Sequence, residues 1–312
     1  MNFSPDDLPE RPTPSPTPAD AVPVWGRAPS PVQAEQSSAD AGGHTDSGLA
    51  AAASHAPNPP PAELIPTAPP DPAWTGWDLV RLIVLIIVAI VFCFFAALLI
   101  ARIWVYPHTA LGEIARVPLV SVAGQSLAYL LILAYMYVLV TRERRRPDFL
   151  AAIHWNWPSN IAVYVFSGFA LSLALQVLAH FLPIPKELPI DSFFRTPAEA
   201  WALSILSVTL APLMEELFFR GFLYPVLARR LGLSTAVFVT ALGFALLHGA
   251  QLMFSWGPVL VIFLVGIVLT MVRAKTNSVA AGVLIHMAYN GTISVAMFAA
   301  TDGFRHLEKL NQ

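Results

Sequence analysis

This 312-residue chain has few charged residues and a single cysteine. Asp, Glu, Lys and Arg make up only 12% of the residues against 56% hydrophobic residues, and the mean hydropathy is +0.61. The single cysteine, Cys93, excludes an intramolecular disulfide and any paired-cysteine zinc motif. The acidic start, Met1–Arg11, has no apolar core, so a cleavable signal peptide is not expected. This composition indicates an integral membrane protein, and no nucleic-acid partner is expected.

Long apolar stretches separated by short charged clusters fill the chain from about residue 79 to residue 300. About 20 apolar residues cross the ~30 Å of hydrocarbon in a bilayer as a helix. The predicted spans are Leu82–Ala101, Val117–Val140, Asn160–Leu182, Ala198–Tyr224, Thr235–Phe254, Pro258–Val272 and Val279–Ala300. The sixth of these is short. Because the runs are continuous rather than alternating, they favour helices over strands. The sequence therefore predicts an all-α, polytopic transmembrane helix bundle of about seven spans.

The first 78 residues have a different chemistry. They hold 17 of the 28 prolines and two arginines against ten acidic residues. Such a segment buries too little apolar surface to order itself, so a disordered N-terminal tail is predicted. Docking of Pro12–Pro18 to a partner with an aromatic groove is the alternative. The predicted organisation is a tail at 1–78, a transmembrane domain at 79–302 and a short C-terminal tail at 303–312.

The lysines and arginines near the span ends predict the orientation, because cytoplasmic loops carry an excess of them. With alternating spans, nine fall on the side of the N-terminus and six on the other. The nine are Arg81, Arg142, Arg144, Arg145, Arg146, Arg229, Arg230, Arg273 and Lys275. A cytoplasmic N-terminus is therefore predicted. The abundant Ala, Pro and Arg indicate a high-GC bacterium, hence the bacterial inner (cell) membrane.

Two adjacent glutamates, Glu215 and Glu216, interrupt the fourth apolar span. A carboxylate at the centre of a membrane helix costs roughly 2.5–3.5 kcal/mol, so it needs a partner or a function. Glu216 and Arg220 are four residues apart in the favourable order, which predicts an ion pair on one helix face. Glu215 points elsewhere and has no such local partner, which makes it the candidate for chemistry.

The fifth and seventh spans each carry one histidine in a four-residue spacing. Phe244 and His248 are predicted to share a helix face, as are His286 and Asn290. If the helix of Glu215 turns near residues 231–232, the antiparallel helix that follows brings His248 level with Glu215. The sequence therefore predicts a Glu/His site inside the bilayer.

The three segments Glu215–Arg220 (EELFFR), Phe244–His248 (FALLH) and His286–Asn290 (HMAYN) resemble the three motifs of the CAAX protease and bacteriocin-processing (Abi) family. The family includes the type II CAAX prenyl endopeptidases. The resemblance covers roughly residues 160–300, which is the predicted protease core. It implies an intramembrane endopeptidase that cuts a membrane-embedded or lipid-anchored protein or peptide.

The resemblance also implies roles. Glu215 and His248 would activate a water, and His286 and Asn290 would stabilise the oxyanion. Glu216, Arg220 and Phe244 would support them. A divalent metal such as zinc on Glu215, His248 and His286 stays open, because two histidines and a glutamate form a known zinc set while no HExxH spacing is present. Seven spans depart from the eight expected of the prenyl endopeptidases.

Two other function classes remain open from the sequence. One is a non-catalytic membrane protein for bacteriocin resistance or scaffolding, which would tolerate Glu215→Gln. The other is a cation-coupled transporter, although no internal repeat of the kind common in transporters is found.

Overall fold

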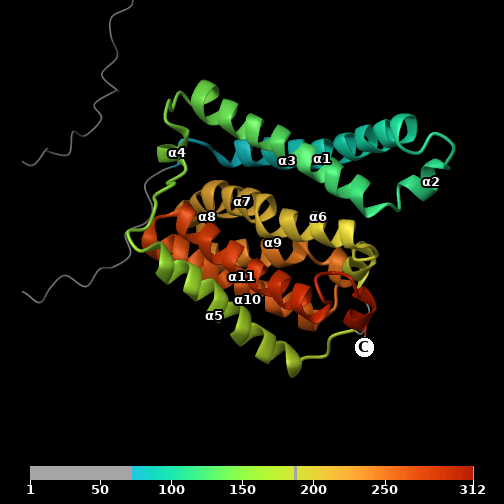
Figure 1. The fold of residues 1–312 in the computed structure, drawn as a ribbon. Coiled ribbons are helices and arrows are strands. Elements are labelled where there is room, and N and C mark those ends of the chain that lie inside the picture. The colour runs from blue at the N-terminus through green and yellow to red at the C-terminus, as the bar shows by residue number, and fades with distance from the viewer. Residues whose placement is uncertain (1–71, 186–187, 312) are drawn as a thin grey trace, which may run out of the picture. The chain divides into compact units, whose positions relative to one another are not determined.

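The computed structural model describes residues 72–185 and 188–311. Every regular secondary-structure element within these ranges is a helix. The predicted all-α polytopic bundle is confirmed (Figure 1). The longer helices are α1 (Gly76–Trp104), α3 (Pro118–Val138), α5 (Ile161–His180), α6 (Pro197–Val208), α7 (Leu210–Glu216), α8 (Tyr224–Leu231), α9 (Leu233–Leu247), α10 (Trp256–Thr276) and α11 (Val279–Ala300). Almost all of the predicted disordered tail lies outside the described residues, and its disorder stays a prediction.

Shorter elements join these helices. α2 (Leu111–Ile114) and α4 (Phe149–Ala152) are single turns. The π-helices η2 (Leu139–Glu143) and η4 (Leu217–Leu223) continue α3 and α7. The 3-10 helices are η3 (Pro189–Phe193), η5 (Ala250–Leu252) and η6 (Leu307–Asn311).

Six helical segments of the described chain are long and apolar enough to cross a membrane. The predicted fifth span, Thr235–Phe254, is the one that falls short, because its helix α9 ends at Leu247 after 15 residues. The chain turns there: the Phe254 amide donates back to the Gly249 carbonyl, and both Met253 and Phe254 have positive φ. The predicted sixth span is longer than expected, since α10 has 21 residues.

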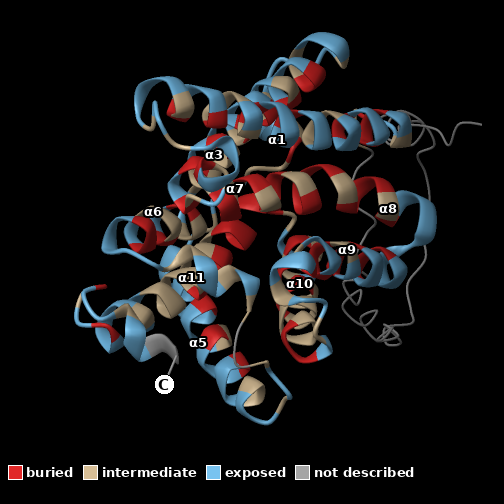
Figure 2. Ribbon diagram, turned by 90° about the vertical axis from the view of Figure 1, so that its right-hand side faces the viewer, coloured by how far each residue is buried: buried red, intermediate tan, exposed pale blue. Residues whose placement is uncertain are grey.

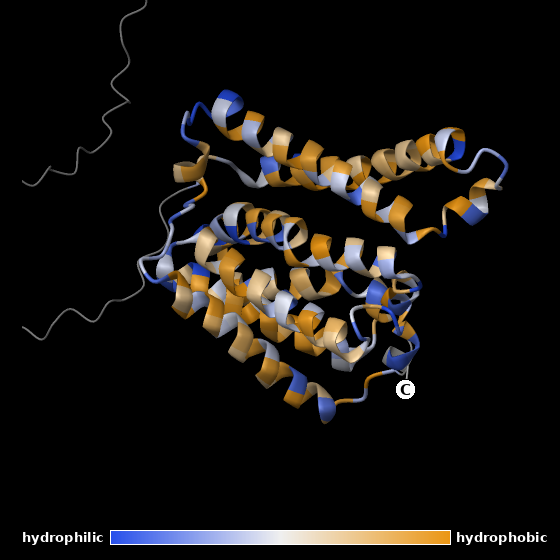
Figure 3. Ribbon diagram, in the orientation of Figure 1, coloured by the Kyte–Doolittle hydropathy of each residue, from blue (hydrophilic) through white to orange (hydrophobic). Residues whose placement is uncertain are grey.

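The outward faces of the bundle are apolar. Phe92 of α1 and Phe166 of α5 are 66% and 68% exposed. Figure 2 shows exposed residues along α1, while α7 is largely buried. Figure 3 shows apolar residues along the helices and hydrophilic ones mainly at helix ends and in loops. Contiguous apolar surface of this extent is unusual on a soluble monomer and is what a lipid environment requires.

The start of α1 is anchored to the bundle. The Trp74 indole, 1% exposed, donates to the Phe222 carbonyl oxygen at 2.9 Å, and the two rings stack with centroids 4.4 Å apart. Thr75 and Asp78 form a capping box, so the helix starts at Gly76, before the predicted tail boundary at residue 78. That boundary falls inside α1, because a tail assignment by composition does not register a helix cap.

Ion pairs bring the start of α1 to the end of α3. Asp78 is paired with Arg144, and Arg81 contacts Glu143 at 2.9 Å. These contacts put the predicted basic cluster and the first helix start at one end of the bundle. The side of the membrane that this end faces stays a prediction.

The helices pack in pairs: α1 against α3, α9 against α10, and α5 against α11 (Figure 1). The α5–α11 contact is close at Gly168. A Cβ added there would lie 2.3 Å from the Ile285 carbonyl oxygen and 2.7 Å from the Ala288 Cβ. Because Ile285 precedes His286 in α11, this glycine sets how near α5 comes to the helix that carries a candidate site residue.

Gly168→Ala is therefore expected to push α5 and α11 apart and to lower the free energy of unfolding by about 1–3 kcal/mol, the usual cost of overpacking. The melting temperature of the purified protein in detergent measures this. Gly112→Ala is the matched control, because a Cβ at Gly112 meets no atom within 4 Å. Equal melting temperatures for the two variants would contradict the close packing.

Candidate active site

A break in the fourth predicted span positions the glutamates. α6 ends at Val208, Thr209 adopts non-helical angles (φ −116°, ψ −83°), and α7 begins at Leu210. Pro212 in the first turn of α7 has no N–H to donate, which favours a break before it. The Asn290 side chain of α11 donates Nδ2–H to the Ser207 carbonyl oxygen at 2.7 Å. Asn290 thus satisfies a backbone carbonyl of α6 next to the break and ties this region to α11.

The hairpin predicted near residues 231–232 is confirmed. α8 ends at Leu231, Gly232 has a positive φ of 79°, and α9 returns alongside α8. Glycine accommodates this φ without strain, which explains the position of the turn. The return brings His248, the residue that caps α9, to Glu215 near the end of α7.

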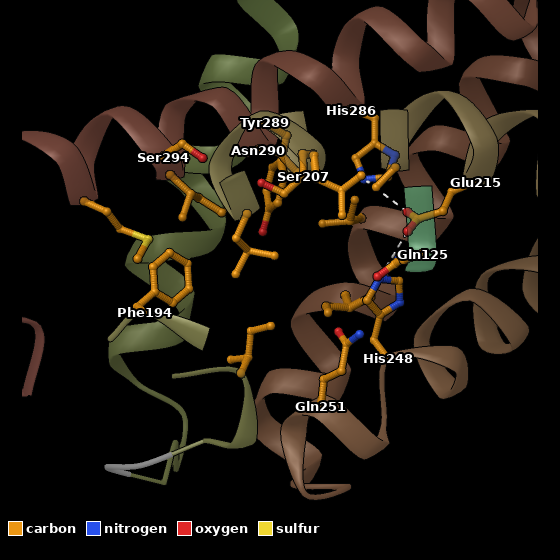
Figure 4. A pocket seen from close by; sticks show the side chains of 18 of the residues that line it. Gln125, Phe194, Ser207, Glu215, His248, Gln251, His286, Tyr289, Asn290 and Ser294 are labelled. Atoms are coloured by element: carbon orange, nitrogen blue, oxygen red, sulfur yellow. Dashed lines mark hydrogen bonds and ion pairs between the residues drawn. The ribbon is translucent and has the colours of Figure 1, made fainter. Parts of the chain in front are cut away.

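Glu215 lies between the two histidines. His248 Nε2 is 3.8 Å from one carboxylate oxygen of Glu215, and His286 Nε2 is 3.7 Å from the other (Figure 4). These separations exceed direct hydrogen-bond length. The side chains of Glu215 and His248 are 15% and 20% exposed, whereas His286 is 4% exposed. The predicted triad of Glu215, His248 and His286 is therefore brought together, and all three side chains line one cavity.

Each histidine is held through its other ring nitrogen. His248 Nδ1 lies 2.9 Å from the Phe244 carbonyl oxygen, which can only accept, so Nδ1 carries the proton. His286 Nδ1 lies 3.0 Å from Glu216 Oε1, which fixes that ring in the same way. The Nε2 atoms of both rings are thus directed toward Glu215.

Glu216 is completely buried between a cation and a histidine. The Arg220 guanidinium contacts Glu216 Oε1 at 2.8 Å, and both side chains are 0% exposed. Arg220 also donates to Thr270 Oγ1 at 3.2 Å and to the Gly266 carbonyl at 3.0 Å. The predicted Glu216–Arg220 pair is confirmed. It forms even though Arg220 lies in the π-helix η4 rather than in regular α-helix.

The Phe244 ring packs against both histidines and the Arg220 guanidinium. Its ring centroid lies 4.9 Å from that of His248 and 5.7 Å from that of His286. The Arg220 guanidinium carbon lies 4.7 Å from the same centroid, a cation–π distance. The predicted common face of Phe244 and His248 is therefore confirmed, and the ring also shields the buried ion pair.

Two cavities meet at Glu215. The first, of about 390 Å³, is lined by Glu215, His248, His286 and Asn290 together with residues of α6 and η3 (Figure 4). The second, of about 680 Å³, lies between α1, α3 and η4 and is walled largely by apolar side chains. Both cavities include Glu215 and His248 in their lining. An apolar segment of a ligand in the second cavity and a more polar segment in the first can thus both reach the Glu215 carboxylate.

Glu215, His248 and His286 are the predicted candidates for a metal site. Within the described residues, no group of three His, Cys, Asp or Glu side chains has the geometry to hold a metal ion. The two histidines approach different oxygens of Glu215, and His286 Nδ1 is bonded to Glu216.

Several contributors to the site were missed from the sequence. The bond from His286 to Glu216 joins residues 70 positions apart, and the sequence patterns gave no signal for it. Gln125 of α3 and Gln251 after α9 line both cavities. A glutamine inside the predicted apolar span Val117–Val140 was the available signal for Gln125.

Residues 197–292 match the family model described as Type II CAAX prenyl endopeptidase Rce1-like. This segment includes all three motifs, from Glu215 to Asn290. No match was found among curated proteins or among solved structures. The match agrees with the resemblance inferred from the motifs: residues 197–292 are similar to the Rce1-like type of CAAX prenyl endopeptidase.

Proposed function

We propose that the protein is an intramembrane endopeptidase that hydrolyses a peptide bond of a membrane-associated substrate at Glu215. The Rce1-like domain supports this reaction class in general. The observation that carries the assignment to Glu215 is its position between two histidine Nε2 atoms at 3.7 and 3.8 Å, in the lining of both cavities. A carboxylate in such a position can take a proton from water.

In the first step, a water held between Glu215 and His248 Nε2 gives a proton to the carboxylate. The resulting hydroxide attacks the scissile carbonyl carbon and forms a tetrahedral oxyanion. The 3.8 Å gap between the two side chains, too long for a direct hydrogen bond, suits a water that bonds to both. Phe244 excludes further water from this face, which strengthens the electrostatic interactions at the site.

In the second step, the oxyanion receives hydrogen bonds from Asn290 and His286. Asn290 uses one amide hydrogen on the Ser207 carbonyl and retains a second for the oxyanion. His286 donates through Nε2 when both ring nitrogens carry protons, and its positive charge then lies between Glu215 and Glu216. Collapse of the intermediate breaks the C–N bond. Glu215 returns its proton to the leaving nitrogen, so the carboxylate is regenerated and no proton is lost.

A proteomic comparison tests this function. Membranes from cells that produce the wild type are compared with membranes from cells that produce Glu215→Gln, and new peptide termini are identified by mass spectrometry. Termini that form only with the wild type, at the ends of membrane-associated proteins, are expected. Identical sets of termini in the two samples would contradict the proposed function.

The mechanism above is metal-free and runs through protein groups and water alone. Activity is therefore expected to survive treatment with 1,10-phenanthroline followed by dialysis. Turnover of a peptide substrate before and after treatment is the measurement. Loss of turnover that zinc restores would overturn the metal-free mechanism and return Glu215, His248 and His286 to the role of zinc ligands.

A further inference from the structure

One polar side chain at the junction of the two cavities is not accounted for by the Glu/His mechanism. Gln125 belongs to α3, outside the segment 197–292 that matches the protease family. It lines both cavities, as Glu215 and His248 do. In Figure 4 the end of its side chain points toward the region between Glu215 and His248. The amide of Gln125 therefore lies where the apolar cavity meets the catalytic one.

The surroundings of Gln125 give no structural reason for an amide. Its Nε2–H donates to the Tyr129 hydroxyl at 2.7 Å, and Tyr129 lies one turn later on the same helix. This bond does not hold α3 to another helix, which is the usual structural use of a glutamine in a membrane bundle. The neighbouring wall of the second cavity is apolar and includes Ile83, Ile87 and Ile132.

The bond to Tyr129 leaves hydrogen-bonding capacity in Gln125. It uses one N–H of the amide, and among the described residues no hydrogen bond reaches the amide oxygen. An acceptor and a second N–H are thus available beside the cavities. A peptide in extended form offers complementary groups, since each residue has a backbone N–H and a C=O that need partners when water is excluded.

We propose that Gln125 is a substrate-positioning residue whose side-chain amide binds the substrate backbone next to the scissile bond. The peptide crosses from the apolar cavity to the catalytic cavity at this point, with its scissile carbonyl at Glu215. The amide oxygen of Gln125 accepts from a substrate N–H, and the bond to Tyr129 holds the amide in the orientation that this contact needs. The proposal rests on the proposed function of the site.

Gln176 of α5 provides a matched control. It is also a glutamine in an apolar helix with a partner one turn away, since its Nε2 lies 3.0 Å from Ser172 Oγ. It is not among the residues that line the two cavities. Gln125→Leu and Gln176→Leu therefore remove the same amide and the same kind of local hydrogen bond, and differ in access to the substrate.

The test uses a fluorogenic peptide that ends in a prenylated cysteine and three further residues, the substrate type named by the family description. Gln125→Leu is expected to raise KM about tenfold, the effect of one lost hydrogen bond, with kcat changed less than about threefold. Tyr129→Phe, which frees the amide, is expected to raise KM less. Gln176→Leu is expected to leave both constants unchanged. Melting temperatures of the variants report whether each is folded.

A second set of peptides identifies the contact itself. One backbone N–H at a time is replaced by N-methyl on either side of the cut. In the wild type, one position is expected to raise KM strongly, and in Gln125→Leu that penalty is expected to vanish because the partner is already gone. An unchanged KM in Gln125→Leu, or the same N-methyl penalty in both proteins, would overturn the inference while leaving the protease function intact. The proposed function fails separately, if wild type and Glu215→Gln give identical sets of peptide termini in the proteomic comparison, and the inference then fails with it.

Discussion

Glu215→Gln is expected to abolish peptide cleavage while the protein stays folded. Glutamine keeps the shape of the side chain but cannot take a proton from water, so the loss of general-base catalysis should lower kcat by about 10²–10⁴-fold. Glu215 makes no direct hydrogen bond to either histidine, because both lie more than 3.5 Å away. Its replacement therefore breaks no bond on which the bundle depends. Turnover and melting temperature of the purified variant in detergent are the two measurements.

The neighbouring glutamate is the natural contrast. Glu216 accepts from Arg220 and from His286 and is fully buried, so Glu216→Gln should lower the melting temperature as well as turnover. Glu215→Gln is thus expected to lower turnover alone, whereas Glu216→Gln is expected to lower both turnover and melting temperature. Glu215→Gln with normal turnover, or with the same drop in melting temperature as Glu216→Gln, would contradict the roles assigned to the two carboxylates.

Many of the contacts around Glu215 and Glu216 were predictable from the spacing of residues along the helices. The four-residue interval from Glu216 to Arg220 predicts their ion pair, and the interval from Phe244 to His248 predicts their ring contact. Gly232 marks the hairpin, because a residue at a φ of 79° is readily accommodated only as glycine. Relations within one turn of helix, or across one tight turn, follow from helix geometry alone.

Relations between helices were not predictable in the same way. The contact from His286 to Glu216 depends on how close α11 comes to α7, and a Cβ at Gly282 would lie 2.7 Å from Glu216 Oε2. The sequence contains the glycine but not the neighbour that requires it. Gln125 was missed for the same reason, since only the packing of α3 beside α7 brings it to Glu215. The chain after α9 was not predictable either, since Met253 and Phe254 adopt positive φ although neither has a turn-forming signature.

Arg220→Ala is expected to lower the stability of the folded protein strongly. The guanidinium donates to Glu216 Oε1, to Thr270 Oγ1 and to the Gly266 carbonyl oxygen, and it is 0% exposed. Its removal leaves a buried carboxylate without its cation, which costs roughly 3–5 kcal/mol. Against a total stability of about 5–15 kcal/mol, such a loss should be visible as a low yield and a strongly reduced melting temperature. Arg81→Ala is the control, because Arg81 forms an ion pair of similar length with Glu143 at the surface, and its loss should change the melting temperature little.

A double variant shows whether the loss comes from the stranded charge or from the missing side-chain volume. In Arg220→Met with Glu216→Gln, methionine fills much of the space and glutamine is neutral but still accepts from His286 Nδ1. If the buried charge is the cause, the double variant should recover most of the melting temperature that Arg220→Ala loses. If packing is the cause, Arg220→Met alone should recover as much. Turnover of the double variant tests one further role of Glu216. In this variant His286 keeps its hydrogen bond but loses the negative charge beside it. A folded double variant with low kcat would indicate that the Glu216 charge stabilises the His286 cation during the reaction.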